Sequence, residues 1–175
     1  MDYIAQFEEK LLNSLLQVCT QQGWLSGVLL QTPDIDGQWQ RLAPSYYGDS
    51  VREFNAYPEY SLACAGYLGM AVACLWDRDW VRFAGEPYSY YQGKRGFDDM
   101  DDHITGKILK DGDFPVRAMR LCSATAFNAL RKESAEPGSV NAYKLFLVTA
   151  AVLYRIGAAL QLHRMNYRFE AVNLR

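Results

Sequence analysis

Two long stretches of this chain are almost free of charged side chains. Residues 60–76 carry no charge, and residues 145–162 carry only Arg155. A helix that spans a membrane needs about 20 predominantly apolar residues, and a charge at its centre costs roughly 3 kcal/mol. We therefore expect the two runs to be central, buried helices of a soluble bundle, near residues 59–83 and 139–163, with no membrane partner.

Helical spacing of apolar residues recurs on either side of these runs. Residues 2–22 predict a helix because Phe7, Leu11 and Leu15 recur every four positions. Pro115 is suited to the first turn of another helix, which we expect to end near residue 132. These two helices should cover the central pair, and a further helix is predicted over residues 98–109.

Residues 24–47 lack such a pattern. Pro33, Gly37 and Pro44 are typical of turns, so only a short helix near residues 49–55 is expected between the first helix and the first apolar run. Nowhere do strands alternate with helices, which argues against a parallel sheet. The sequence predicts an all-α fold, a single domain over residues 1–175 with five or six helices.

Composition narrows the functional classes. The 175 residues include four cysteines without a CxxC pair, and the formal net charge is -2. A zinc ribbon is therefore unsupported, and nucleic acid is an unlikely partner because no strong positive field is present. The N-terminus has no basic segment followed by an apolar one. We expect a cytoplasmic protein with buried, reduced thiols.

The first candidate for a functional site is an acidic segment that could bind a metal ion. Asp98, Asp99, Asp102 and His103 would gather on neighbouring faces of a helix, where carboxylates and an imidazole could bind Mg²⁺ or Mn²⁺. The spacing of the three aspartates matches the DDxxD motif of isoprenoid synthases, but a second metal motif is missing, so no family is assigned. The alternative is that the acids cap a helix and complement its dipole. We otherwise expect no cofactor.

A second candidate is Arg155, because a buried guanidinium requires a carboxylate partner. The acidic segment at 98–102, Glu53 and Glu59 are the expected partners. Arg155 could instead bind an anionic ligand. His163 lies eight residues later on the same predicted helix face, where it could bind the same ligand or complement the C-terminal dipole.

A third candidate is the loop at residues 85–97, in which Tyr90 and Tyr91 precede Lys94 and Arg95. Aromatic and basic side chains together can bind a ligand, and they occur in proteins that bind single strands. A tyrosine-rich loop can equally pack over a seam between helices.

No HExxH, GxSxG or phosphate-loop motif is present. We therefore expect a non-enzymatic interaction or regulatory domain that binds a protein partner or forms a homodimer. The alternative is a small metal-dependent hydrolase, or a bundle that binds an anionic ligand, with the acidic segment and Arg155 as its site.

Overall fold

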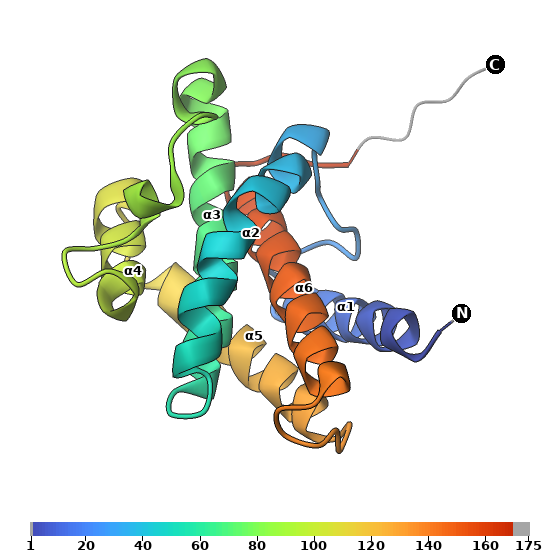
Figure 1. The fold of residues 1–175 in the computed structure, drawn as a ribbon. Coiled ribbons are helices and arrows are strands. Elements are labelled where there is room, and N and C mark those ends of the chain that lie inside the picture. Colours follow the sequence, from blue (N-terminus) through green and yellow to red (C-terminus); the bar gives the residue numbers. More distant parts are fainter. Residues whose placement is uncertain (1, 170–175) are drawn as a thin grey trace.

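The described part of the chain consists of helices and the turns between them. The computed structural model describes residues 2–169, which contain no β-strand and one isolated β-bridge, between Gly93 and Gly96. These residues form six α-helices (Figure 1): α1 Tyr3–Gln21, α2 Pro33–Glu53, α3 Pro58–Phe83, α4 Met100–His103, α5 Phe114–Arg131 and α6 Val140–Arg164. The predicted all-α fold is confirmed.

Helices α3 and α6 form the centre of the bundle, as predicted. Their backbones touch because glycines line the seam. A Cβ atom at Gly69 would lie 2.0 Å from the carbonyl oxygen of Tyr154, and one at Gly157 would lie 2.1 Å from that of Gly66. Such distances leave no room for any side chain. The seam therefore depends on glycine at these positions.

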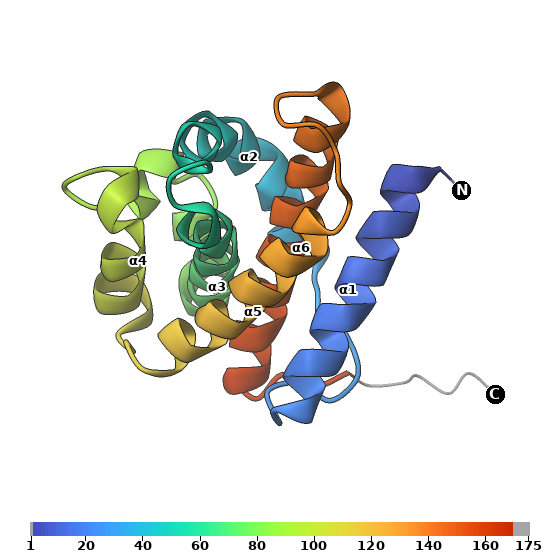
Figure 2. The same cartoon turned by 90° about the horizontal axis from the view of Figure 1, so that it is seen from below.

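The other helices cover this pair from different sides. Helix α2 crosses over both in Figure 1, and Figure 2 shows α5 and α1 packed around α6 while α4 lies at the far side of α3. Helix α1 begins after Asp2, whose carboxylate accepts the N–H of Ala5, and it buries Phe7, Leu11 and Leu15. The predicted covering role of α1 and α5 is confirmed.

Residues 24–47 were expected to be irregular. This is correct for residues 24–32 but wrong for residues 33–47, which belong to α2. Thr32 caps α2 by accepting the N–H of Ile35, and Pro33 occupies the first turn, where proline needs no hydrogen-bond donor. Pro44 lies inside the helix. The buried face, Ile35, Trp39, Leu42 and Tyr46, still follows helical spacing. Burial of these side chains outweighs the turn-forming residues between them.

The predicted regular helix over residues 98–109 is also wrong in detail. Residues Phe97–Asp99 form a 3-10 turn, α4 has one turn, and Ile104–Leu109 is π-helical. Met100, Ile104 and Ile108 are buried at four-residue intervals, so the segment keeps its apolar face against α3. Lys110 ends it in the left-handed region, with φ 54°.

Among residues 2–169, α6 is the one helix that is long and apolar enough to cross a bilayer. In the structure, 72% of its most apolar window is buried inside the protein. Core helices pass the same length and hydropathy test, so this property alone is weak evidence for a membrane.

The α3–α6 seam gives the first prediction. Gly69→Ala should lower the free energy of unfolding by about 1–3 kcal/mol, because the added methyl group meets the backbone of α6. Urea unfolding followed by circular dichroism measures this loss. Gly37→Ala is the matched control in α2, where nothing lies within 4 Å of a Cβ; it should stabilise by about 0.5–1 kcal/mol. Equal effects of the two substitutions would contradict the steric argument.

Candidate functional site

The acidic segment does not gather its side chains at one point. Asp98 and Asp102 are exposed. Asp99 turns back instead and accepts the backbone N–H of Arg95, at 3.1 and 3.2 Å from its two oxygens. Its carboxylate fills the space beside Gly93, where a Cβ would lie 2.3 Å away. Asp99 thus closes the turn between residues 93 and 96.

His103 and Asp101 are directed to other partners. The Nε2 atom of His103 lies 3.0 Å from the carbonyl oxygen of Tyr90, and Asp101 accepts a hydrogen bond from Tyr60 at 3.3 Å. Within residues 2–169, no three His, Cys, Asp or Glu side chains are placed to hold a metal ion. The geometry therefore gives the predicted Mg²⁺ or Mn²⁺ site no support. Asp99 precedes α4 but makes no capping bond to it.

Tyr91 and Tyr90 hold the 85–97 loop on the bundle. Tyr91 is completely buried and Tyr90 is partly buried, with its ring 5.4 Å from that of Tyr91 and 6.1 Å from that of Phe83. Burial raises the pKa of Tyr91, and its hydroxyl has no hydrogen-bond partner among residues 2–169. These contacts match the packing alternative for the loop.

The expected partners of Arg155 are wrong. Its guanidinium lies 4.0 Å from Glu8 of α1 and is 31% exposed. Burial raises the pKa of Asp36, and the charge of Arg155 opposes this rise. The 98–102 segment is out of reach, because α3 and α6 stand between it and α1 (Figure 2). Helix α1 covers this face of α6, so the carboxylate comes from α1.

His163 lies near the end of α6, as predicted, two turns and about 12 Å beyond Arg155. Its Nε2 atom lies 3.2 Å from the hydroxyl of Ser26. Burial and the nearby Arg168 lower the pKa of His163. The imidazole and the guanidinium thus have separate partners.

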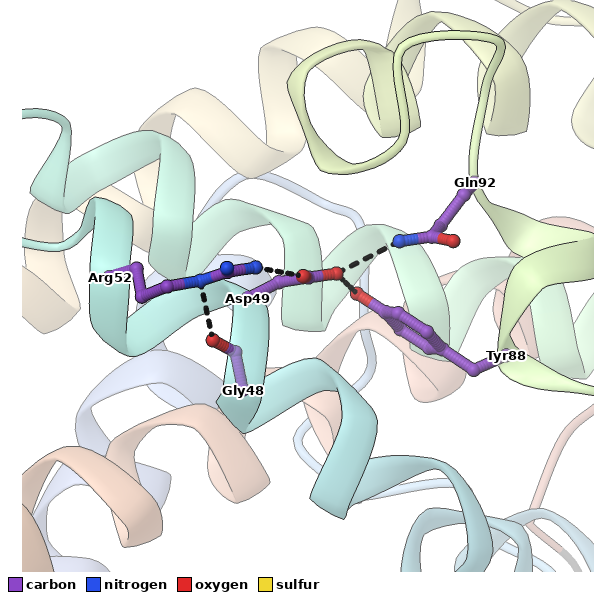
Figure 3. Close-up of polar contacts among 5 residues, drawn as sticks. All are labelled: Gly48, Asp49, Arg52, Tyr88 and Gln92. Carbon is purple, nitrogen blue, oxygen red and sulfur yellow. Dashed lines mark hydrogen bonds and ion pairs between the residues drawn. The ribbon is translucent and has the colours of Figure 1, made fainter.

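Asp49 forms a polar junction that the sequence analysis did not find (Figure 3). One carboxylate oxygen accepts the Tyr88 hydroxyl at 3.0 Å and the Gln92 amide at 2.9 Å. The other oxygen pairs with Arg52 at 2.9 Å. Burial and the Asp49 charge raise the pKa of Tyr88, which keeps its hydroxyl a donor. The junction ties α2 to the loop that precedes α4.

An apolar groove lies on another side of α2. It has a volume of about 720 Å³ and is bounded by the end of α2, the end of α5, residues 134–139 and the start of α6. Phe54 forms its aromatic base with Phe127 and Phe146, at ring distances of 6.1 and 5.0 Å. Phe127 lies on α5, Phe146 lies on α6, and Phe54 directly follows the end of α2.

The rim of this groove is apolar and exposed. Val51, Tyr143 and Val140 are 43%, 47% and 69% exposed. Arg131 is the only charged residue among those that line the groove. Its guanidinium stacks over Phe127 at 5.2 Å and donates to Asn128 at 3.0 Å. Within the described residues, no carboxylate forms an ion pair with it.

Comparisons with protein-family models, with curated protein sequences and with solved structures find no significant match. The functional argument therefore rests on the side chains of this chain. The groove combines the features of a binding surface, whereas the residues of the acidic segment diverge.

The Asp49 junction gives the second prediction. Tyr88→Phe should destabilise the fold by about 1–2 kcal/mol, because it removes a hydrogen bond to a half-buried carboxylate. Thermal and urea unfolding measure the loss. Tyr90→Phe is the matched control two residues away, since its hydroxyl makes no hydrogen bond among residues 2–169. If Tyr88→Phe were as stable as this control, the junction would contribute nothing to stability.

Asp101 gives a prediction about pH. Burial raises the pKa of this carboxyl above 3.8, so the fold favours the protonated form and loses stability as pH rises through the raised value. Asp101→Asn should therefore gain stability relative to wild type between pH 3.5 and pH 7, as measured by urea unfolding at each pH. Asp98→Asn, at an exposed position, controls for the loss of one negative charge. A stability difference between Asp101→Asn and wild type that stays the same at every pH would contradict this prediction.

Proposed function

We propose that this chain is a non-enzymatic interaction domain that binds an apolar helical segment of a partner protein in the groove between α2, α5 and α6. The observation that carries the proposal is the exposed apolar rim of Val51, Val140 and Tyr143 above an aromatic base. Contiguous exposed apolar surface is typical of interaction sites, and aromatic side chains are enriched among binding hot spots.

The surroundings of the groove support a partner with an acidic residue. Arg131 has no carboxylate partner among the described residues, and its stacking on Phe127 keeps the guanidinium beside the apolar surface. The N-terminus of α6, capped by Ser139, borders the same groove. Both features favour a nearby negative charge.

A helix is the partner structure that fits best. A groove between helices accepts apolar side chains from one helix face, spaced at i, i+3, i+4 and i+7. The expected segment thus carries Leu or Phe at that spacing and Asp or Glu beside them. The alternative from the sequence, a metal-dependent hydrolase, has less support because its four expected ligands point to different surroundings.

The test uses a designed peptide as the probe. A fluorescent amphipathic helix with leucines on one face and a glutamate beside them should bind the wild-type protein, as measured by fluorescence anisotropy. Val140→Glu should weaken binding at least roughly tenfold, because it places a charge on the apolar rim. Val81→Glu is the matched control, since Val81 is 96% exposed and lies on α3, away from the groove.

Three results would overturn this proposal. One is failure of the peptide to bind. Another is equal loss of binding in the Val140 and Val81 variants. The third is a concentration-dependent dimer in light scattering that Val140→Glu dissociates, because the groove would then be occupied by a second copy of the chain. If a peptide with lysine in place of the glutamate binds as tightly as the original, only the role assigned to Arg131 is contradicted.

A further inference from the structure

Two cysteine thiols face each other in the seam between α1 and α5. The sulfur atoms of Cys19 and Cys122 are 3.6 Å apart, although 103 positions separate them in the sequence. Both residues are fully buried. A sulfur–sulfur bond is about 2.05 Å long, so an approach of roughly 1.5 Å would join the two atoms.

We propose that Cys19 and Cys122 are a site of reversible oxidation, in which a hydroperoxide such as hydrogen peroxide converts the two thiols into a disulfide that fastens α1 to α5. This inference is independent of the groove and of its partner. In a reducing compartment, disulfides of this kind are transient and respond to oxidants.

The environment distinguishes the two sulfurs from each other and from the remaining cysteines. The hydrogen bond between the thiols lowers the pKa of Cys19 and raises that of Cys122. This arrangement favours Cys19 as the attacking sulfur, since the thiolate is the reactive form. Burial raises the pKa of Cys64 and of Cys74, and neither lies in a thiol pair.

A cleft lies on the same seam, and neither cysteine lines it. It has a volume of about 390 Å³ and lies between α1 and α5, with Leu11 and Ser14 on one side and Thr125 on the other. Thr125 is one helical turn from Cys122. Helix α1 lies at the edge of the bundle (Figure 2). A small oxidant thus needs only a local opening of one outer helix.

The reaction balances with one peroxide molecule. The Cys19 thiolate attacks one peroxide oxygen, an S–O bond forms, the O–O bond breaks, and the released hydroxide takes up a proton to become water. The sulfur of Cys122 then loses its proton and attacks the Cys19 sulfur, so that an S–S bond forms and the S–O bond breaks. The departing hydroxide takes that proton as a second water. Each sulfur loses one electron, and each peroxide oxygen gains one.

Peptide mapping of the intact protein tests the site. Native protein treated with hydrogen peroxide should lose two hydrogen masses and yield a linked peptide pair containing Cys19 and Cys122, which dithiothreitol separates. Because the bond closes a loop of about 100 residues, the melting temperature should rise by on the order of 10 °C.

Cys74→Ala is the matched control, because Cys74 is the most exposed of the four thiols; this variant should still form the linked pair. Cys19→Ser should form none and show no rise in melting temperature. Mapping of the wild-type protein decides the matter even if Cys19→Ser does not fold. Oxidation of Cys74 alone, or a Cys19–Cys122 link that forms only in urea, would overturn the proposal.

Discussion

The direct contact between the backbones of α3 and α6 is the constraint on which the rest of the structure depends. Gly69 and Gly157 bring the two helices so close that any larger residue would meet a carbonyl oxygen. Gly66 leaves room for α5 to pack against α3, because a Cβ atom at this position would lie 2.1 Å from the sulfur of Met119 in α5. One short stretch of α3 thus sets the positions of α6 and α5 together, and both of these helices border the apolar groove.

The central pair and the two covering helices could be predicted because their signals are local. Uncharged runs, proline at a first turn and apolar residues every three or four positions all lie within single segments. The same approach predicted only the end of α2, near residues 49–55, because Pro33 and Pro44 look like chain breaks. There, burial of Trp39 and Tyr46 against other helices decides the structure, and a single segment does not reveal that environment.

The candidate sites were harder to predict because they depend on contacts between distant residues. Asp49 meets Tyr88 across 39 positions, and Arg155 meets Glu8 across nearly the whole chain. Three aspartates and a histidine that are close together in sequence were candidates for one metal site, yet their side chains have different surroundings in the structure. The residues that line the groove form no sequence motif, since they appear in the sequence as ordinary apolar residues near helix ends. Only their exposure in the fold distinguishes them.

The base of the groove has a consequence for selectivity. Phe127 and Phe146 lie on α5 and α6, and Phe54 directly follows α2. Helices α5 and α6 are held against the glycine-rich core of α3. The proposed binding site is therefore preorganised, and little of its conformational entropy remains to be lost on association. The ordering cost then falls on the incoming chain. Among segments with the same apolar side chains, those already helical in solution should be favoured over those that must fold on contact.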